Sequence, residues 1–186
     1  MVLALLTALG LGYLSGSLPW GLWLGRAMRG VDVRTLGSKN LGATNVYRSL
    51  GPAVGVPVLL LDIAKGALPT WLVPGMAACA AFPGGLEWCR LSVAAAAVLG
   101  HMFTVFAGFR GGKGVATSAG VLLALSPVAF AATLLVFVAT VAITRYISLG
   151  SMLGAVALAV IVRHKDNIVR LARGEERRFS FKRSAA

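Results

Sequence analysis

The sequence has 186 residues, of which 58% are hydrophobic and 13% are charged, about half the charged share of a soluble domain. This hydrophobicity excludes an intrinsically disordered chain, and two cysteines are too few for a disulfide-stabilised scaffold. Lysine and arginine total 18 against six acidic residues, which gives a net charge of +12. The composition therefore predicts an all-α polytopic membrane protein, with residues 1–186 forming a single domain.

The basic residues fall into two blocks between apolar stretches. Arg26, Arg29, Arg34, Lys39 and Arg48 form the first, and eight more basic residues lie from Arg163 to Arg183. Short basic segments of bacterial membrane proteins stay in the cytoplasm, so we expect both blocks there, with residues 164–186 as a cytoplasmic tail. Membrane lipids with anionic headgroups are expected partners. No aromatic and basic module for nucleic acid is visible, so no nucleic-acid binding is predicted.

The charges delimit the first part of the chain clearly. Residues 1–25 carry no charge and lack the basic start of a signal peptide, which predicts an uncleaved helix with its N-terminus outside. Residues 26–50 are expected to be a polar cytoplasmic segment, 52–73 a second span, 74–90 an external connection and 91–109 a third span. About 20 apolar residues are needed to cross a bilayer core.

Cys79 and Cys89 lie in or beside the expected external connection. We expect them to pack as small apolar side chains. A disulfide between them is the alternative.

The helix count after residue 110 has two solutions. Residues 114–144 are uncharged and are divided by Ser126-Pro127, which gives either two short helices or one long kinked helix, because proline interrupts helical hydrogen bonds. After Arg145 come about 17 apolar residues and the basic tail. One crossing over 114–144 keeps that tail inside, as the positive-inside bias favours. Together with the three earlier spans, these two solutions give five or six transmembrane helices, some of them short.

Residues 36–48 form the first polar cluster. Its small residues let a backbone approach a ligand closely. Ser38, Asn40 and Asn45 offer neutral hydrogen-bond donors, and Arg48 offers a planar group suited to phosphate. The alternative is a polar loop in which Ser38 or Asn40 caps a helix.

The second cluster centres on Arg110, Gly111, Gly112 and Lys113. Gly-Gly-Lys-Gly at a helix start exposes backbone N–H groups beside an ammonium, which is a generic anion site. A Walker A loop is excluded, because Ala107 stands where its first glycine is required and Gly114 replaces the Ser or Thr.

Three further ionisable residues lie inside apolar segments. Asp62 and Lys65 share one helical face and are expected to pair, either as a structural link or at the border of the active site. His101 is either a structural residue or a proton acceptor. No second His or Cys lies at ligand spacing, so no metal site is predicted.

Five strings, in this order, resemble one family, the bacterial membrane acyl-phosphate:glycerol-3-phosphate acyltransferases called PlsY. They are Gly37-Ser38-x-Asn40-x-Gly42-Ala43-Thr44-Asn45-x-x-Arg48, Asp62-x-x-Lys65-Gly66-x-x-Pro69, Gly100-His101-x-Phe103-x-Val105-Phe106-x-x-Phe109-x-Gly111-Gly112-Lys113-Gly114-Val115-Ala116-Thr117, Arg145-Tyr146-x-Ser148-Leu149 and Arg163-His164-x-x-Asn167-Ile168-x-Arg170-Leu171. The resemblance implies transfer of a fatty acyl group from acyl phosphate to the 1-hydroxyl of glycerol 3-phosphate. The products would be 1-acyl-glycerol 3-phosphate (lysophosphatidic acid) and phosphate, in the first step of phospholipid synthesis at the bacterial inner membrane. No cofactor is implied, and protein partners are not indicated.

The resemblance also suggests roles for individual residues. The candidates for catalysis are Ser38, Asn40, His101 and Lys113. The candidates for substrate binding are Ser38, Asn45, Arg48, Gly111, Gly112, Lys113, His164 and Asn167. Asp62, Lys65 and Arg110 would support them. Acyl phosphate is already activated, so no covalent enzyme intermediate is required, and the proton acceptor is either the substrate's own phosphate or His101.

One segment departs from the family pattern. The family has seven helices, with two apolar segments between the Arg-Tyr-x-Ser-Leu and Arg-His-x-x-Asn strings, whereas residues 147–162 supply one. Our hypothesis is that residues 115–144 cross once, so that His164 and Asn167 stay on the same face as Ser38. With the resemblance taken into account, about five to seven transmembrane helices are expected, some of them short, with the active site at the cytoplasmic face. An inactive relative and a membrane anion transporter are the alternatives.

Overall fold

The computed structural model describes residues 2–80 and 82–176, and all regular elements in these ranges are helical. The prediction of an all-α protein is therefore confirmed. The chain divides into two compact units, residues 1–131 and 132–186, which are described one at a time. Residues 177–186 of the expected basic tail lie outside the described residues.

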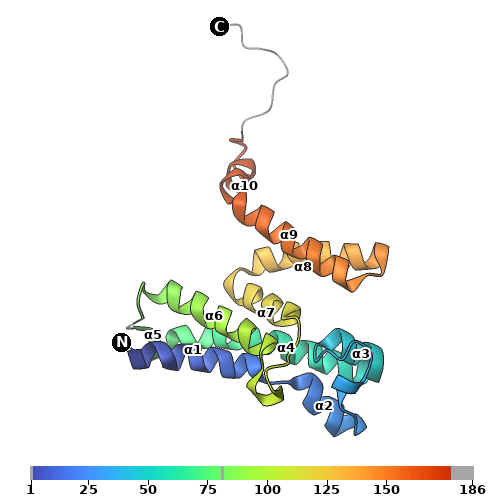
Figure 1. Cartoon of the computed structure of the whole chain (residues 1–186). Coiled ribbons are helices and arrows are strands. Elements are labelled where there is room, and N and C mark those ends of the chain that lie inside the picture. The colour runs from blue at the N-terminus through green and yellow to red at the C-terminus, as the bar shows by residue number, and fades with distance from the viewer. Residues whose placement is uncertain (1, 81, 177–186) are drawn as a thin grey trace, which may run out of the picture. The chain divides into compact units, whose positions relative to one another are not determined.

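Unit 1 is built on three long helices that lie side by side (Figure 1). These are α1 (Val2–Ser17), α4 (Pro52–Leu72) and α6 (Leu86–Met102), and α7 (Val115–Leu125) packs along α4. Four shorter elements complete the polar end, namely α2 (Trp20–Arg29), α3 (Ala43–Leu50) and the 3₁₀ turns η1 (Val33–Thr35) and η3 (Val105–Ala107). At the opposite end of α4 lie η2 (Val73–Gly75) and α5 (Ala77–Ala80).

Among the described residues, four helical stretches are long and apolar enough to cross a membrane, namely Val2–Arg29, Pro52–Gly75, Leu86–Ala107 and Pro127–Thr144. A fifth arises when α9 (Ile147–Arg163) and α10 (Lys165–Ala172), bent by 70° at their junction, are counted as one span. The first stretch is interrupted between α1 and α2 at Pro19, since proline has no N–H to continue a helix. The structure thus agrees with the lower end of the expected helix count.

The region from 114 to 144 forms two helices rather than one long kinked helix. They are α7 and α8 (Pro127–Thr144), and Ser126 between them is extended, with φ −155° and ψ 93°. The residue before a proline avoids helical geometry, which explains the break. With 11 residues, α7 is about 16 Å long, well short of a bilayer core of about 30 Å.

Glycines bring the backbones of α1 and α6 into direct contact. A Cβ atom added at Gly16 would overlap the carbonyl oxygen of Ala97, and one added at Gly100 would overlap that of Tyr13. Small residues allow such close approach between membrane helices. The ends of α1 and α6 are consequently held at a fixed spacing.

Glycines also bring the backbones of α4 and α7 into direct contact. A Cβ atom at Gly66 would overlap the carbonyl oxygen of Thr117, and one at Gly120 would overlap that of Ile63. Two glycine-rich loops lie in unit 1, the first at residues 36–42 and the second at residues 108–114. The start of α7, which follows the second loop, is therefore fixed against the middle of α4.

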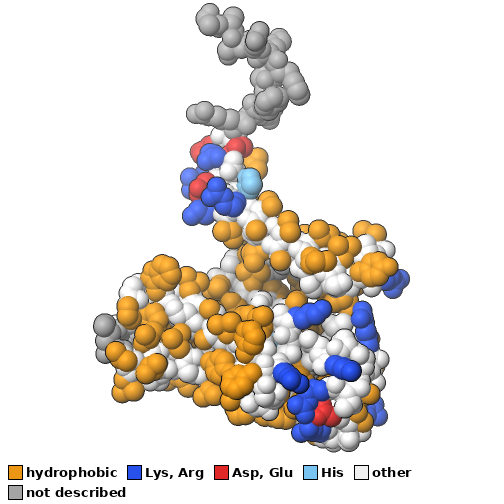
Figure 2. Space-filling view, viewed as in Figure 1, with side chains coloured by type: hydrophobic (Ala, Val, Ile, Leu, Met, Phe, Trp, Pro, Cys, Tyr) orange, Lys and Arg blue, Asp and Glu red, His pale blue; other side chains and the backbone are white. Residues whose placement is uncertain are grey.

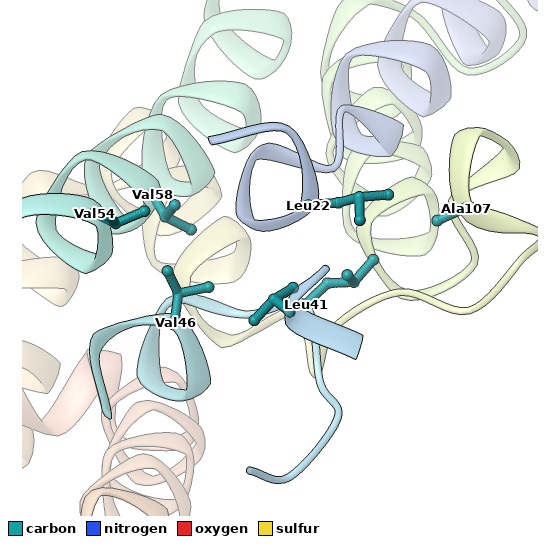
Figure 3. Close-up of a cluster of buried hydrophobic side chains, with 7 residues drawn as sticks. Leu22, Leu41, Val46, Val54, Val58 and Ala107 are labelled. Carbon is teal, nitrogen blue, oxygen red and sulfur yellow. The ribbon is translucent and has the colours of Figure 1, made fainter. Parts of the chain in front are cut away.

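An apolar cluster lies under the polar end of unit 1 (Figure 3). Leu41 comes from the first glycine-rich loop and Ala107 from the segment before the second, yet both belong to this cluster. Its members are Leu22, Val33, Leu41, Val46, Val54, Val58 and Ala107. On the face of unit 1 that Figure 2 shows, the basic side chains gather at this end, around α2 and α3, whereas the long side is largely apolar.

Cys79 and Cys89 form a disulfide at the other end of unit 1, with their Cα atoms 5.7 Å apart. Both are buried in a second apolar cluster that includes Ala8, Phe82 and Val93. The expectation of two unpaired cysteines was wrong, because the turn at Gly84 and Gly85 returns the chain so that the start of α6 meets α5.

Unit 2 contains the larger part of α8 followed by α9 and α10. Gly150 of α9 lies against Phe137 and Val141 of α8, and Gly154 lies against Thr133. These contacts form a close helical hairpin within the unit.

Candidate active site

Asn45 orders the first glycine-rich loop from inside. It is 5% exposed, and its Nδ2 donates to the carbonyl oxygens of Asn40 at 2.9 Å and Leu36 at 3.2 Å. Its Oδ1 accepts from the N–H of Ser38 at 2.9 Å, and the Oδ1 of Asn40 accepts from the N–H of Gly42 at 2.8 Å. Both amide side chains are thus bonded to the loop backbone.

The N-cap of α3 is Gly42, so the alternative in which Ser38 or Asn40 caps a helix does not hold for α3. Ser38, Lys39 and Arg48 are exposed. Within the described ranges, no hydrogen bond or ion pair engages their side chains. These side chains are therefore available to an anion.

The second glycine-rich loop folds back on the end of α6. The N–H of Gly111 donates to the carbonyl oxygen of Met102 at 3.0 Å, and that of Gly112 donates to the carbonyl oxygen of His101 at 3.0 Å. Lys113 follows and is exposed, as is Arg110.

Gly114 has φ 78° and is the N-cap of α7. This left-handed conformation favours glycine and turns the chain directly from Lys113 into the helix. The first N–H groups of a helix have no partner inside it. Together with the Lys113 ammonium they are the groups from which the sequence predicts an anion site, and that role stays a prediction.

The two loops meet at one end of unit 1. Leu41 and Ala107 share the apolar cluster described above. Leu41 and Gly112 also line a small polar cavity of about 10 Å³, which is about the room one water needs. Leu41 and Gly112, 71 residues apart in the sequence, thus lie together. The cavity itself is far too small to hold a phosphorylated polar molecule.

Three ionisable side chains lie buried behind the loops. Lys65 Nζ is 2.8 Å from Asp62 Oδ1 and donates to the carbonyl oxygen of Leu18 at 2.8 Å. His101 Nδ1 lies 3.7 Å from the same Asp62 oxygen. Asp62 is 1% exposed, and Lys65 and His101 are 5% exposed. The expected pair of Asp62 and Lys65 is present, and His101 adjoins it.

The sequence analysis missed the contribution of α1 to this region. Thr104 donates its hydroxyl to the carbonyl oxygen of Ser17, and Tyr13 donates to that of Phe103 at 2.6 Å. Ser15 donates to the carbonyl oxygen of Lys65 at 3.1 Å. The signal that could have predicted this contribution was the recurrence of hydroxyl side chains in an otherwise apolar, uncharged helix.

Asp32 organises the chain between α2 and α3. Its carboxylate bonds the guanidinium of Arg34 at 2.7 Å and that of Arg26 at 2.7 Å, and it accepts from the backbone N–H of Arg34 at 2.9 Å. The side-chain hydrogen bond from Arg34 is the main reason that the pKa of Asp32 lies well below its usual range, although partial burial opposes the shift. Arg26 and Arg34 are thus neutralised in part, whereas Arg48 is not.

His164 and Asn167 belong to unit 2. His164 Nδ1 lies 2.9 Å from the carbonyl oxygen of Val160, and Asn167 Nδ2 donates to Glu176 at 3.1 Å. Glu176 also pairs with Arg170 at 2.7 Å. These contacts lie inside the unit, so a joint role with the loops of unit 1 stays a prediction.

Within residues 2–80 and 82–176, no three His, Cys, Asp or Glu side chains are grouped to hold a metal ion. What the loops offer is cationic side chains, backbone N–H groups and hydroxyls beside apolar helices. That set of groups is suited to binding a phosphorylated polar molecule next to a lipid.

Residues 6–174 match the family model described as glycerol-3-phosphate acyltransferase. A glycerol-3-phosphate acyltransferase of Geobacter sulfurreducens is 43% identical over 189 positions, which cover 90% of this chain and 93% of the relative. The enzyme of that name from Desulforudis audaxviator is 40% identical over 203 positions, covering 97% and 98%.

Two crystal structures of PlsY, an integral membrane glycerol 3-phosphate acyltransferase, share the fold. The glycerol 3-phosphate form has a TM-score of 0.74 and 35% identity, covering 95% of this chain and 96% of that one. The lysophosphatidic acid form has a TM-score of 0.68 and 36% identity, with 95% of each chain covered.

The alignments also show a deletion. The Geobacter alignment spans 189 positions, but 90% of 186 residues is about 167, so about 22 of its positions have no residue in this chain. That is the length of one membrane crossing, and it agrees in size with the shortened segment before Arg163. With this difference, the chain is a membrane protein that belongs to the glycerol-3-phosphate acyltransferase family.

Proposed function

We propose that the protein transfers a fatty acyl group from acyl phosphate to the 1-hydroxyl of glycerol 3-phosphate. The products are 1-acyl-glycerol 3-phosphate and inorganic phosphate. The observation that carries the proposal is the meeting of two glycine-rich loops, each followed by an exposed cation, above one apolar cluster.

Arg48 and Lys113 bind phosphate oxygens in this proposal. Arginine offers two parallel donors to a phosphate, and the Lys113 ammonium stands beside the free N–H groups at the start of α7. Gly111 and Gly112 let this loop pack on the end of α6, because the Cβ positions of both face His101. Arg110 adds positive charge at the loop, while Asp62 and Lys65 support it from behind.

Ser38 and Asn40 orient the reacting groups in this proposal. The substrate hydroxyl oxygen attacks the acyl carbon, a new ester bond forms, and the bond from that carbon to the phosphate oxygen breaks. The hydroxyl proton passes to the departing phosphate, so no enzyme base is required. A donor aimed at the developing oxyanion lowers the barrier most, and the exposed Ser38 hydroxyl is our candidate.

An apolar cavity of about 330 Å³ offers room for a lipid chain. It is lined by Ala67, Leu68, Trp71, Leu123, Ala124 and Pro127. Leu68 lies one helical turn along α4 from Lys65. A chain that extends from the loops along α4 would enter this cavity.

We further propose that residues 1–186 act as one acyltransferase domain in the bacterial inner membrane. The N-terminus lies outside and the loops face the cytoplasm, because the basic segments follow the positive-inside rule. His164 and Asn167 of unit 2 are proposed to bind glycerol 3-phosphate on the resemblance to the family alone.

The donor is tested with purified protein in lipid nanodiscs. Acyl phosphate, acyl-CoA and an acylated carrier protein are each supplied with glycerol 3-phosphate, and lysophosphatidic acid is quantified. We expect product from acyl phosphate alone, with one phosphate released per product. Equal rates from a thioester donor would contradict the proposal.

The site is tested with Arg48→Ala and Lys113→Ala. We expect each to lower kcat/KM for glycerol 3-phosphate by about 100-fold or more, since charge-assisted bonds to phosphate are lost. Arg90→Ala is the matched control, because Arg90 lies near the disulfide end of α6 and pairs only with Glu87 among the described side chains. Wild-type rates in either loop variant would refute the site.

The deletion of about 22 positions favours a second candidate, a relative that binds glycerol 3-phosphate without turnover. Calorimetry of the purified protein with glycerol 3-phosphate distinguishes the two. Binding that depends on Arg48 in a protein with no transferase activity would support the second candidate.

A further inference from the structure

We propose that His101 is a positioning residue that holds the Gly111-Gly112-Lys113 loop in its phosphate-binding shape, with the Asp62 and Lys65 pair as its fixed support. The inference rests on the proposed function, because it assigns a task to the buried cluster behind the loop. It also removes His101 from the candidates for proton acceptor.

The first observation is the contact between His101 and Gly112. A Cβ atom added at Gly112 would overlap the Nε2 atom of the His101 imidazole. The N–H of Gly112 donates to the backbone carbonyl of the same histidine at 3.0 Å. The loop therefore lies on His101 through both its backbone and its imidazole.

The second observation is that the imidazole has nowhere to move. His101 is buried, and its Nδ1 faces Asp62 Oδ1 at 3.7 Å. The adjoining cavity of about 10 Å³ is far smaller than an imidazole and has about the room of one water. A side chain so confined transmits a displacement of Gly112 instead of absorbing it.

The third observation is that the support extends to the other loop. Lys65 pairs with Asp62 and also donates to the carbonyl oxygen of Leu18, at the end of α1. Leu41 of the first loop lines the same cavity as Gly112, His101 and Lys65. The buried cluster thus sets where each loop rests, and with it the spacing of the cations that the loops carry.

The same geometry argues against acid–base chemistry at His101. Its Nε2 faces the Cα side of Gly112 and its Nδ1 faces Asp62. A general base must come within hydrogen-bond reach of the proton that it removes. Neither ring nitrogen is directed to the exposed side of the loops.

A double-mutant cycle tests the contact. Gly112→Ala is expected to raise KM for glycerol 3-phosphate about tenfold or more, because its methyl group displaces the loop from the imidazole. In His101→Ala/Gly112→Ala the imidazole is gone and the methyl group fits. We expect the double variant to bind glycerol 3-phosphate at least as well as His101→Ala alone.

Gly111 supplies the specific control. A Cβ atom at Gly111 would overlap the backbone carbonyl oxygen of His101, which every substitution at 101 retains. His101→Ala should therefore leave the loss caused by Gly111→Ala unrelieved. Gly10→Ala, where a Cβ atom would have no neighbour within 4 Å, should leave all kinetic constants unchanged.

Separate readouts distinguish the possible roles of His101. A positioning role raises KM for glycerol 3-phosphate more than it lowers kcat, and leaves KM for acyl phosphate unchanged. If His101 were a general base, its removal would lower kcat and abolish one limb of the pH profile. Either this outcome or failure of the double variant to recover would overturn the inference. A wild-type protein without any transferase activity would instead refute the proposed function.

Discussion

Lys65 links α4 to the end of α1 behind the candidate site. It pairs with Asp62, bonds the carbonyl oxygen of Leu18 and stands beside His101 through the shared cavity. The spacing of Asp62 and Lys65 predicted the ion pair. The bond to Leu18 was not predictable, because it depends on how α1 ends against α4, and no local pattern encodes that contact.

Lys65→Met should destabilise the protein by about 3 kcal/mol. It removes the ammonium but leaves the Asp62 carboxylate buried, and breaking a buried pair on one side is costly. Thermal unfolding in detergent measures the loss.

Asp62→Leu/Lys65→Met is the matched comparison. Removing both charges avoids the unpaired carboxylate, so we expect the double variant to recover most of the loss. A double variant less stable than Lys65→Met would show that the pair does not act as a unit.

At the scale of single elements, the helix pairs owe their close packing to glycines that face backbone oxygens. Gly16 and Gly100 bring α1 and α6 together, as Gly66 and Gly120 do for α4 and α7. The sequence showed many glycines, but only the helix pairing reveals which of them face a neighbouring carbonyl.

Gly16→Ala should lower stability by about 2 kcal/mol, since its methyl group would overlap the Ala97 carbonyl oxygen and the backbones must separate. Gly10→Ala in the same helix meets no atom within 4 Å and should be neutral or stabilising by up to about 1 kcal/mol. The comparison is made by thermal unfolding of both variants in one detergent.

The connection between α2 and α3 should respond to acid. The pKa of Asp32 is below its ordinary value of 3.8 in the folded protein, mainly through Arg34. Its stabilising contribution is therefore complete above that ordinary value and is lost as the pH falls below it, because protonation then favours the unfolded chain.

Unfolding between about pH 3 and pH 7 tests this dependence against Asp32→Asn. The wild-type protein should lose more stability than the variant as the pH falls through the ordinary pKa of Asp32. Parallel curves would contradict the role of the carboxylate.

At the scale of the whole molecule, the sequence predicted the spans better than the site. The second span was expected at 52–73 and is α4, Pro52–Leu72, since Gly51-Pro52 marks its start and the apolar run its length. The meeting of Leu41 with Gly112 around one cavity depends on tertiary packing. The residue pattern of each loop pointed to anion binding by itself, and the resemblance to a family suggested that the two loops serve one site.

The deletion makes the sidedness of the tail a direct test of function. We expect cysteines introduced as Ser38→Cys and Asn167→Cys to be labelled from the cytoplasmic side alone, because both lie near basic segments. Labelling in intact cells with an impermeant reagent, before and after permeabilisation, measures this. Labels from opposite sides would favour the relative that binds without turnover.

The disulfide between Cys79 and Cys89 indicates the redox environment of the end of unit 1 that lies away from the loops. Paired thiols persist in oxidising compartments and are rare in a reducing cytosol. The protein is extracted from cells in the presence of an alkylating reagent, then reduced and alkylated again. Mass spectrometry should show two more alkyl groups after the reduction. Because α4 and α6 each run from this end to the loops, the oxidation state of the cysteine pair also indicates which compartment the loops face. The phosphorylated substrate would come from that compartment.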